Sequence, residues 1–309
     1  EKWKEELKKQ CVNIGSPNPF QARERGMGKR YVLFVDHYVP TFDKDAGSKT
    51  TYQYLKMLAE KGVQIKFLGD NFLKEEPYTE ALEQMGIEVL YGSEMQGGIW
   101  KWMEDNKQMI QIAYLNRPHI ASKYIDYIKE NTDWKIIFYG HDLHFLRLQR
   151  EYALKPRPEL LEEIAYFKSM ELSVLQKADI SYYPSNLEVE EIHKIDDSIP
   201  VKAITAYVFS DSVQVEKMTE GREGMLFVGG FAHPPNEDGV LWFAKEIFPL
   251  MRRQLPNLRF RIVGSKPTEK VLALGQQEGI EVLGFVSDEK LHSLYQESRM
   301  VIVPLGYGA

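Results

Sequence analysis

The sequence predicts an α/β fold of two Rossmann-like, doubly wound parallel-sheet domains, the second of them incomplete. Three observations predict this class. The chain has 309 residues, enough for two domains at roughly 100–200 residues each. From Arg30 onward, short apolar strands alternate with helical segments, as in parallel sheets that are covered on both faces. From Met225, a strand, two adjacent glycines and a helix start follow in order, as in nucleotide-binding α/β domains.

Four segments are expected along the chain. Residues 1–30 combine a charged start with a Gly/Pro/Asn/Arg stretch, which indicates an appendage or linker. Residues 31–210 are predicted to form the first domain. The polar stretch 211–224 ends in two glycine-containing turns and is the predicted interdomain linker, so residues 225–309 form the second domain.

In the first domain, one helix is predicted from Ser48 to Lys61, because Gly62 suits the position that follows a helix end. A second helix is predicted over Pro158–Lys177, where apolar residues recur at helical spacing. The predicted strands are short and apolar: Tyr31–Val35, Gln64–Leu68, Glu88–Tyr91, Met109–Tyr114, Lys135–Tyr139, Ile180–Tyr183 and Val201–Ala206.

The second domain begins with the strand Met225–Val228. A helix follows, with Asn236 as its predicted N-cap and apolar residues at helical spacing up to Pro256. Ser287 is predicted to cap a later helix. The remaining predicted strands are Phe260–Val263, Glu281–Leu283 and Met300–Pro304.

The glycine turn after the strand Met225–Val228 predicts a site for an anionic ligand. Gly229 and Gly230 let the backbone come close to a ligand, or supply a positive φ that a side chain would obstruct. The helix start beyond them offers free N–H groups and a positive dipole end, which suit a phosphate.

Composition is that of an ordinary globular protein, with 43% hydrophobic and 27% charged residues. The net charge of −6 argues against a general nucleic-acid binder. The single cysteine, Cys11, excludes an intramolecular disulfide and a cysteine-cluster metal site, and it suits a reducing cytoplasm. No apolar run approaches the roughly 18 residues that span a bilayer, and the charged N-terminus is not a signal peptide. We therefore expect a cytoplasmic protein, which is compatible with work at the inner face of the membrane.

Four motifs in order, FVGGF, RIVG, VLGFVSD and VIVPL, resemble the C-terminal domain of GT-B glycosyltransferases of the family 4 type, the glycosyl transferases group 1. The resemblance implies a GT-B fold and a retaining hexosyltransferase. Such an enzyme moves a sugar from a nucleoside diphosphate sugar to a glycan or lipid-linked acceptor, in the assembly of cell-wall or cell-surface polysaccharide. It implies no cofactor or metal besides the nucleotide-sugar substrate, and a peripheral contact with the membrane.

The family continues after its last strand with a glycine loop that bears a basic residue, followed by a Glu that holds the donor. The chain stops at Ala309. We therefore expect the native gene product to continue past this residue with those elements.

The resemblance also implies a set of donor-binding residues. In the family, the glycine turn approaches the diphosphate, the following helix start lines its pocket, and the loops after the next two strands contact the nucleoside and the base. Two plainer interpretations stay open: Lys266 as a solvated loop lysine, and Phe285 as a core residue. The implied residues are Gly229, Gly230, Phe231, His233, Asn236, Gly264, Lys266, Phe285 and Val286.

The loop after the first strand resembles the acceptor-side glycine loop of GT-B enzymes. Gly47 lies at a helix start, with Asp45 before it and Ser48 able to cap the helix. A tight turn plus a helix cap is the plainer interpretation. Farther along the chain, Glu188 of the Ser185–Glu188 turn is expected to cap the helix that follows it.

His141 and Asp142, after the strand Lys135–Tyr139, are the candidate catalytic residues. An imidazole titrates near neutral pH and can stabilise charge or orient a hydroxyl. The resemblance implies that His141 faces the donor sugar and that Asp142 orients it or contacts the acceptor. A helix cap is the alternative for His141. A metal site with His144 is disfavoured, because no further ligand clusters with these residues.

Two other functions stay open. One is a non-catalytic sugar-nucleotide or glycan-binding module of a larger synthase. The other is a nucleotide-sugar epimerase of GT-B shape, which would release free sugar without an acceptor.

Overall fold

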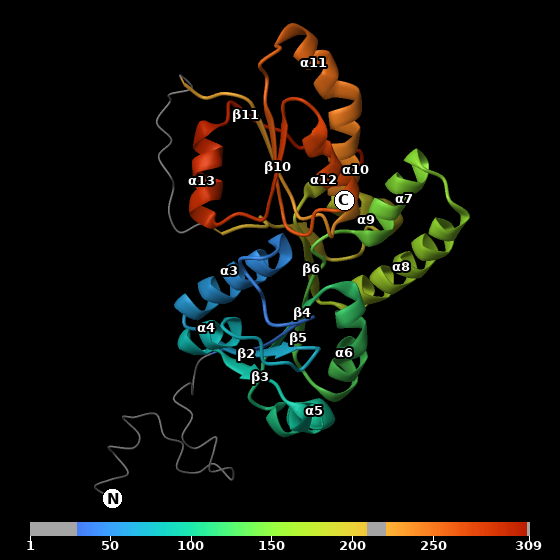
Figure 1. Cartoon of the computed structure of the whole chain (residues 1–309). Coiled ribbons are helices and arrows are strands. Elements are labelled where there is room, and N and C mark those ends of the chain that lie inside the picture. The colour runs from blue at the N-terminus through green and yellow to red at the C-terminus, as the bar shows by residue number, and fades with distance from the viewer. Residues whose placement is uncertain (1–29, 209–220, 308–309) are drawn as a thin grey trace, which may run out of the picture. The chain divides into compact units, whose positions relative to one another are not determined.

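Figure 1 shows the computed structural model of the chain, which describes residues 30–208 and 221–307. The predictions for residues 1–29 and for most of the linker 211–224 lie outside the described residues. The chain forms two compact units. The first comprises Glu1–Leu143 and Ala165–Phe209, and the second comprises His144–Ile164 and Ser210–Ala309.

The first unit is built on a parallel sheet with the strand order β3-β2-β1-β4-β5-β6-β7. This order reverses direction between β1 and β4, so these two strands mark the topological switch point at which open α/β sheets bind ligands. The strands are β1 Tyr31–Asp36, β2 Gln64–Gly69, β3 Glu88–Leu90, β4 Ile112–Asn116, β5 Lys135–Tyr139, β6 Ile180–Tyr183 and β7 Val201–Ala203.

One strand of this sheet is displaced from its predicted position. The sequence predicts Met109–Tyr114, whereas β4 is Ile112–Asn116. Met109 and Ile110 instead close the turn after a helix, since the N–H groups of both donate to the Asn106 carbonyl oxygen. The helices that accompany the sheet are α3 Ala46–Glu60, α4 Tyr78–Gln84, α5 Ser93–Asn106, α6 Pro118–Asn131, α8 Pro158–Lys177 and α9 Asn186–Ile195.

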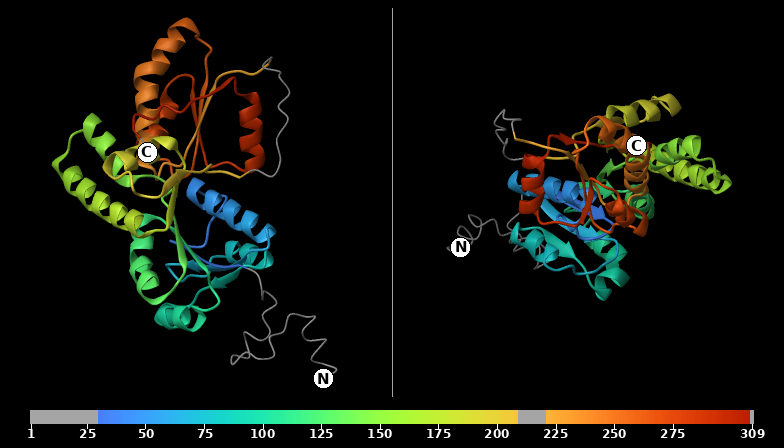
Figure 2. Two further views of the ribbon diagram at one scale, coloured as in Figure 1. Left: turned by 180° about the vertical axis from the view of Figure 1, so that it is seen from behind. Right: turned by 45° about the horizontal axis from the view of Figure 1, so that its top comes forward.

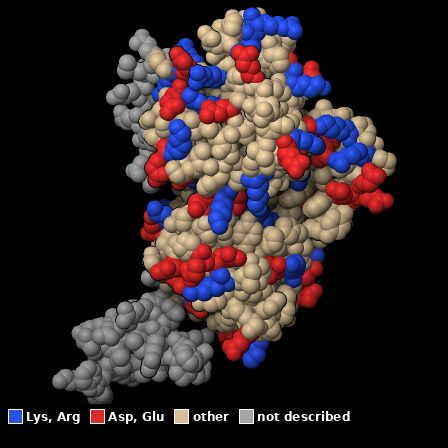
Figure 3. Space-filling model, viewed as in Figure 1, with Lys and Arg blue, Asp and Glu red and all other residues tan. Residues whose placement is uncertain are grey.

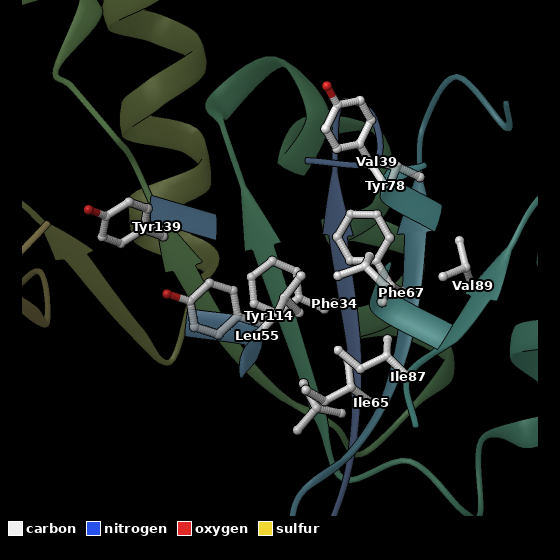
Figure 4. Packing of buried hydrophobic residues seen from close by; sticks show 12 residues of the cluster. Phe34, Val39, Leu55, Ile65, Phe67, Tyr78, Ile87, Val89, Tyr114 and Tyr139 are labelled. Carbon is white, nitrogen blue, oxygen red and sulfur yellow. The ribbon is translucent and has the colours of Figure 1, made fainter. Parts of the chain in front are cut away.

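Aromatic side chains on adjacent strands pack together on one face of this sheet (Figure 4). The rings of Phe34 on β1 and Tyr114 on β4 stack with centroids 4.4 Å apart and planes 8° apart. Phe67 on β2 lies 5.9 Å from Phe34. Each such pair adds about 0.5–1.5 kcal/mol beyond the burial of area. The row therefore fixes the positions of the three strands whose carboxyl ends carry polar residues.

The second unit has a smaller parallel sheet with the order β10-β9-β8-β11, and helices cover both of its faces. Leu294 on α13 packs with Leu226 and Val263 against one face. Val240 and Phe248 pack with Phe260 against the other, so α13 and the α10–α11 helix lie on opposite sides of the strands (Figures 1 and 2). The elements are α7 His144–Leu154, β8 Met225–Val228, α10 Pro234–Trp242, a π-helical turn Phe243–Ile247, α11 Phe248–Gln254, β9 Phe260–Val263, α12 Glu269–Ala273, β10 Ile280–Gly284, α13 Asp288–Glu297 and β11 Met300–Val301.

Two predictions about helix starts in this unit have different outcomes. The Ser287 cap is confirmed, because its side chain accepts a hydrogen bond from the Lys290 N–H. The Asn236 cap is wrong: α10 begins at Pro234, with His233 in the capping position. Proline at the first helical position has its φ already set for a helix, so Pro234 and Pro235 start the helix earlier than predicted.

The last predicted strand, Met300–Pro304, is shorter in the structure, where β11 covers only Met300–Val301. Pairing continues one residue further, through a hydrogen bond from Ile302 N to Leu226 O. Pro304 has no N–H to extend the ladder. Of the apolar residues in this segment, Val303 is 73% exposed.

The segment His144–Ile164 groups with the second unit, although the sequence-based boundary places it in the first domain, residues 31–210. Two contacts explain this grouping. Lys155 forms an ion pair with Asp238 on α10, and Leu154 Cδ1 lies 3.5 Å from the position that a Cβ on Gly306 would take. The sequence holds no local sign of these contacts, because the partners are more than 80 residues away.

The turn after β5 is held from two sides within the first unit. Gly140 lies against the fully buried ring of Tyr183, and a Cβ on this glycine would overlap that ring. Leu143 N donates to Glu188 Oε1 at 3.0 Å. Glu188 also forms the expected capping box with Ser185, which confirms its predicted role at the start of α9. Residues 140–143 therefore have a fixed position on this edge of the sheet.

We predict that Gly140→Ala lowers the free energy of unfolding by about 1–3 kcal/mol or more, because the added methyl group has no space beside Tyr183. Urea denaturation measures this loss. Gly98→Ala, in the middle of α5 with no atom within 4 Å of its added Cβ, is the matched control and should stabilise the chain by about 0.5–1 kcal/mol. Equal stability of Gly140→Ala and the wild type would contradict the packing.

We also predict an unusual pH dependence from Glu188. Burial raises the pKa of this carboxyl group from 4.5 to about 7, against the hydrogen bonds from Ser185 and Leu143. Between these two pH values, the folded chain holds a proton that the unfolded chain has lost. The free energy of unfolding should therefore fall as pH rises through this window, by up to about 3 kcal/mol.

Glu188→Gln keeps an acceptor oxygen without the charge, so this part of the pH dependence should disappear in the variant. Urea denaturation of both proteins at pH 5 and pH 7.5 measures the difference. If the free energy of unfolding changed equally in the two proteins between pH 5 and pH 7.5, the pKa of Glu188 would not be raised in the fold.

Candidate functional site

A buried carboxylate lies at the switch point of the first sheet. Asp36, the last residue of β1, is 2% exposed. Its oxygens accept hydrogen bonds from Thr51 Oγ1 at 2.9 Å, Asn116 Nδ2 at 2.8 Å and the His37 N–H at 2.7 Å. These donors come from α3, β4 and the loop after β1. Asp36 therefore joins the three segments that meet at this edge.

The fourth partner of Asp36 is Arg117, whose Nε donates to Asp36 Oδ1 at 2.7 Å. Burial alone would raise the pKa of Asp36, but the charge of Arg117 and the hydrogen bonds from Arg117 and His37 bring it below its ordinary value. Arg117 precedes α6 and has a φ of 60°. A positive φ costs a side-chain-bearing residue about 1–3 kcal/mol, and residues strained in this way cluster at functional sites.

Three side chains surround Gly47, the second residue of α3. A Cβ placed on Gly47 would lie 3.1 Å from Arg117 Nη2, 3.4 Å from Asp45 Oδ1 and 3.7 Å from His141 Nδ1. We call these three side chains and Gly47 the Gly47 cluster. The cluster joins two regions that the sequence predicted separately, the acceptor-side loop and the candidate catalytic residue His141.

Within the acceptor-side loop, the predicted capping role belongs to a different residue. Asp45, not Ser48, is the N-cap of α3, and its Oδ1 accepts from the Ser48 N–H at 2.8 Å. The Ser48 hydroxyl donates to Asp45 Oδ2 at 2.6 Å, so Ser48 holds the capping carboxylate. Tyr38 also donates to this oxygen. A carboxylate at a helix N-terminus is favoured by the helix dipole.

His141 has a φ of 57° and packs its ring edge-on against Tyr139, with centroids 4.7 Å apart. Its Nε2 atom is buried and has no hydrogen-bond partner among the described residues. Burial and the neighbouring charge of Arg117 lower the pKa of His141 to about 4, although Asp36, Asp142 and Asp45 act in the opposite direction. The imidazole is therefore uncharged at neutral pH.

Asp142 follows in the same loop, where its N–H donates to Gly140 O at 2.7 Å in a tight turn. Its carboxylate raises the pKa of His141 and so lies close enough to influence the ring. The helix α7 begins only at His144.

In the second unit, the three loops after β8, β9 and β10 are joined by their backbones. Gly229 N donates to Val263 O at 3.0 Å, Phe231 N donates to Ser265 O at 2.9 Å, and Gly264 N donates to Gly284 O at 2.9 Å. Because the strands are parallel neighbours, these loops share one edge of the sheet. The predicted donor residues of β8, β9 and β10 thus lie together on that edge.

The three glycines of these loops have different roles. A Cβ on Gly264 would overlap the Gly229 carbonyl oxygen, and one on Gly229 would lie 2.9 Å from Asn236 Nδ2, so both are required for packing. Gly230 has only Ser265 Oγ near its Cβ position, at 3.4 Å. The sequence offered two reasons for a glycine at position 230. One of them, a positive φ, is wrong, because the φ of Gly230 is not positive. The other reason, close approach of a ligand, stays a prediction.

The helix start after Gly230 has fewer free donors than predicted. Pro234 and Pro235 occupy its first two positions and have no N–H groups. The Asn236 N–H donates to His233 O, and its side chain donates to Gly230 O at 2.8 Å. Gly230 N has no acceptor among the described residues. An anion at this edge would therefore meet the Gly230 N–H and the helix dipole.

The remaining predicted donor residues differ in how far their side chains are exposed. Phe231 is buried in the core at 5% exposure, so only its backbone faces the loop. His233 is exposed in the capping position of α10. Phe285 is 64% exposed, which overturns the interpretation as a core residue. Lys266 is exposed with a φ of 52°, and Val286 is half-buried against α13.

Sequence reasoning missed Asp36, Asn116 and Arg117. Each follows or ends an apolar strand, at the edge where α/β sheets bind ligands, and that position was the available signal. The pairing itself was not visible, because Asp36 and Arg117 are 81 residues apart in sequence.

No group of three or more His, Cys, Asp or Glu side chains that could hold a metal ion occurs in residues 30–208 or 221–307. None of the helices in these ranges has the length and apolarity needed to cross a bilayer. On the face shown in Figure 3, basic and acidic side chains are interspersed among the described residues.

Comparison with known proteins agrees with the resemblance at the C-terminal end. Residues 222–308 match the family model described as glycosyl transferases group 1. An uncharacterized 44.6 kDa protein in the cps region of Klebsiella pneumoniae is 26% identical over 91 residues. That alignment covers 28% of this chain and only 24% of the relative.

Solved structures extend the likeness to most of the chain. A UDP-forming α,α-trehalose-phosphate synthase from Burkholderia xenovorans aligns with a TM-score of 0.52 at 11% identity, covering 90% of this chain and 78% of that one. UGT2 from Phytolacca americana, complexed with UDP-2-fluoroglucose and pterostilbene, aligns with a TM-score of 0.50 at 10% identity, covering 90% and 81%. The predicted fold class is confirmed, with the second domain the smaller. Residues 222–308 thus match the group 1 glycosyltransferase model, and the chain as a whole has the GT-B fold.

Proposed function

We propose that this chain is a retaining glycosyltransferase that moves a sugar from a nucleoside diphosphate sugar to a glycan or lipid-linked acceptor. The observation that carries the proposal is the open backbone at Gly230, within the segment that matches the glycosyltransferase family. Its neighbours Gly229 and Gly264 are needed for packing, whereas Gly230 is not. A ligand that approaches the backbone explains a glycine there.

The donor would bind along the shared edge of β8, β9 and β10. The Gly230 N–H would donate to a diphosphate oxygen, and the exposed Lys266 would offset part of the diphosphate charge. Phe285, with most of its ring exposed, offers a surface for the base. UDP or a UDP-sugar appears in the names of both solved relatives, and this supports a nucleotide-sugar donor.

His141 would contact the donor sugar as an uncharged imidazole. Glycosyl transfer builds positive charge on the sugar ring, which an imidazolium would oppose. A neutral ring can hydrogen-bond a sugar hydroxyl without that penalty. Asp142 would orient His141 or contact the acceptor. The binding energy of the nucleotide would hold the anomeric carbon in place, and the reaction calls on no separate cofactor. The proposal that the anomeric configuration is retained rests on the family resemblance.

The acceptor would belong to cell-surface polysaccharide assembly, because the Klebsiella relative is encoded in a cps region. We place the reaction in the cytoplasm, at the inner face of the membrane. Asp45, Gly47 and Ser48 would form the acceptor side.

A direct test measures UDP binding by calorimetry and then follows UDP-glucose in the presence and absence of a mixture of polyprenyl-phosphate-linked acceptors. Sugar transfer to an acceptor with its anomeric configuration kept is the expected result. UDP binding without turnover would indicate a binding module instead, and release of free sugar without an acceptor would indicate the epimerase. No affinity for UDP or for other nucleoside diphosphates would contradict the donor site.

We predict that His141→Ala lowers kcat by roughly 10²-fold or more, the scale of a lost acid–base or electrostatic group. Folding should survive, since the His141 side chain makes no hydrogen bond to the described residues. Steady-state kinetics on both proteins, with circular dichroism as the folding control, tests the assignment. Turnover close to the wild-type value would remove His141 from the reaction.

We predict that Gly230→Val weakens UDP binding about tenfold or more, a loss of about 1.4 kcal/mol, with a smaller effect on the melting temperature. Gly230→Ala is the milder variant, because its methyl group meets only Ser265 Oγ at 3.4 Å. Calorimetric titration with UDP gives the affinities, and thermal melts give the stabilities. UDP affinity equal to that of the wild type in both variants would make the Gly230 turn merely structural.

A further inference from the structure

Arg117 is held in one position by features on both of its sides. Its N–H donates to the Tyr139 carbonyl oxygen at 3.1 Å, which ties it to β5, and its Nε donates to Asp36 at the end of β1. The backbone between these two anchors has a φ of 60°. A conformation of this cost persists only where the surroundings fix it.

Beyond Nε, the guanidinium group lies over the Tyr38 ring, with Cζ 5.9 Å from the ring centroid. Nε is the only Arg117 side-chain atom with a hydrogen bond to the described residues. Nη2 and the His141 Nδ1 both lie within 4 Å of the same point above Gly47. Any side chain at position 47 would stand between the arginine and the imidazole. The glycine therefore allows these two groups to approach each other.

The Gly47 cluster is poorly suited to bind an anion. Asp36 neutralises the charge of Arg117 through a direct ion pair, and Asp45 Oδ1 faces the same point at 3.4 Å. Two carboxylates beside one guanidinium leave no excess positive charge for a phosphate or a carboxylate ligand. The charge of Arg117 thus acts on the groups of the protein, and one of these is His141, whose Nδ1 lies 3.7 Å from the same Cβ position on Gly47.

We propose that Arg117 is a positioning residue for the reaction: anchored by Asp36, it holds its positive charge beside Gly47, close to the His141 ring, and keeps that imidazole uncharged. Its link to catalysis rests on the proposed contact of His141 with the donor sugar. The state of His141 itself can be measured without any substrate.

The charges around His141 come from four elements. Arg117 at the start of α6 lowers the pKa of the imidazole, second only to burial in its effect. Asp36 at the end of β1, Asp142 in the loop of His141, and Asp45 before α3 each raise it by less. The uncharged ring of Tyr139 packs against it edge-on. Removal of the positive charge of Arg117 should therefore move the pKa of His141 upward.

The test is an NMR titration of the seven histidine side chains in the full chain, with the His141 signals assigned from a His141→Gln variant. In Arg117→Gln, the pKa of His141 should rise by on the order of one unit, the lower end of the effect of a charge at close range. Arg117→Lys keeps a charge at this site and should restore part of the original value. Lys123→Gln removes a charge from the same helix, where Lys123 pairs with Asp70 at 2.6 Å, and should leave His141 unchanged.

Arg117→Gln leaves the buried Asp36 carboxylate without its ion partner, which can unfold the chain. The double variant Asp36→Asn/Arg117→Gln replaces the ion pair with a neutral hydrogen-bonded pair. It should raise the pKa of His141 by a smaller amount, because the effect of Arg117 exceeds that of Asp36. An unchanged pKa of His141 in both the single and the double variant would overturn the proposal.

UDP binding separates this proposal from the function on which it rests. Calorimetry on Arg117→Gln should give the wild-type affinity for UDP, since the proposed donor loops belong to the second unit. The acid limb of the pH profile of UDP-glucose turnover should move upward with the pKa of His141. If the wild-type chain does not bind UDP, the proposed function is contradicted, but the effect of Arg117 on His141 is not. If Arg117→Gln raises the pKa of His141 but leaves the acid limb of the pH profile of turnover unshifted, the positioning role is contradicted.

Discussion

The buried carboxylate of Asp36 is the interaction on which the first unit depends at its functional edge. It joins β1 to β4 through Asn116, to α3 through Thr51 and to the start of α6 through Arg117. A buried ion pair contributes little net stability, because removing two charges from water offsets most of their attraction. Its consequence here is geometric. Four donors around one carboxylate hold the segments at the switch point in a single arrangement. The Gly47 cluster depends on that arrangement.

The second unit reaches a comparable rigidity without buried charge. Gly229 and Gly264 let two neighbouring loops touch through their backbones, and hydrogen bonds continue the contact to Gly284. Asn236 then fixes the carbonyl of Gly230 from the helix side. The N–H of Gly230 has no acceptor among the described residues. Close backbone packing thus leaves this donor in a fixed position, which suits recognition of an anion.

The sequence predicted what depends on local pattern. Apolar runs located β1, β5, β6, β8 and β9, and the Ser185–Glu188 spacing predicted the capping box. Where two residues competed for a cap, the local pattern was insufficient: Asp45 displaced Ser48, and the prolines before Asn236 began α10 early. Arg117 could not be found, because its partner comes from a distant strand. The exposure of Phe285 likewise depends on a chain bend at Gly284, whose φ is 67°.

The uncharged state of His141 connects these constraints to chemistry. A histidine near Asp36, Asp45 and Asp142 would ordinarily be expected to hold a proton at neutral pH, since three carboxylates favour the imidazolium. Burial and Arg117 together outweigh them. Asp36 in turn is satisfied by Arg117, and Asp45 by the start of α3, so both carboxylates are already committed to other cations or dipoles. The positions that sequence reasoning treated as separate caps, turns and catalytic groups therefore form one electrostatic system, in which the carboxylates of Asp36 and Asp45 are compensated locally and the imidazole is left neutral.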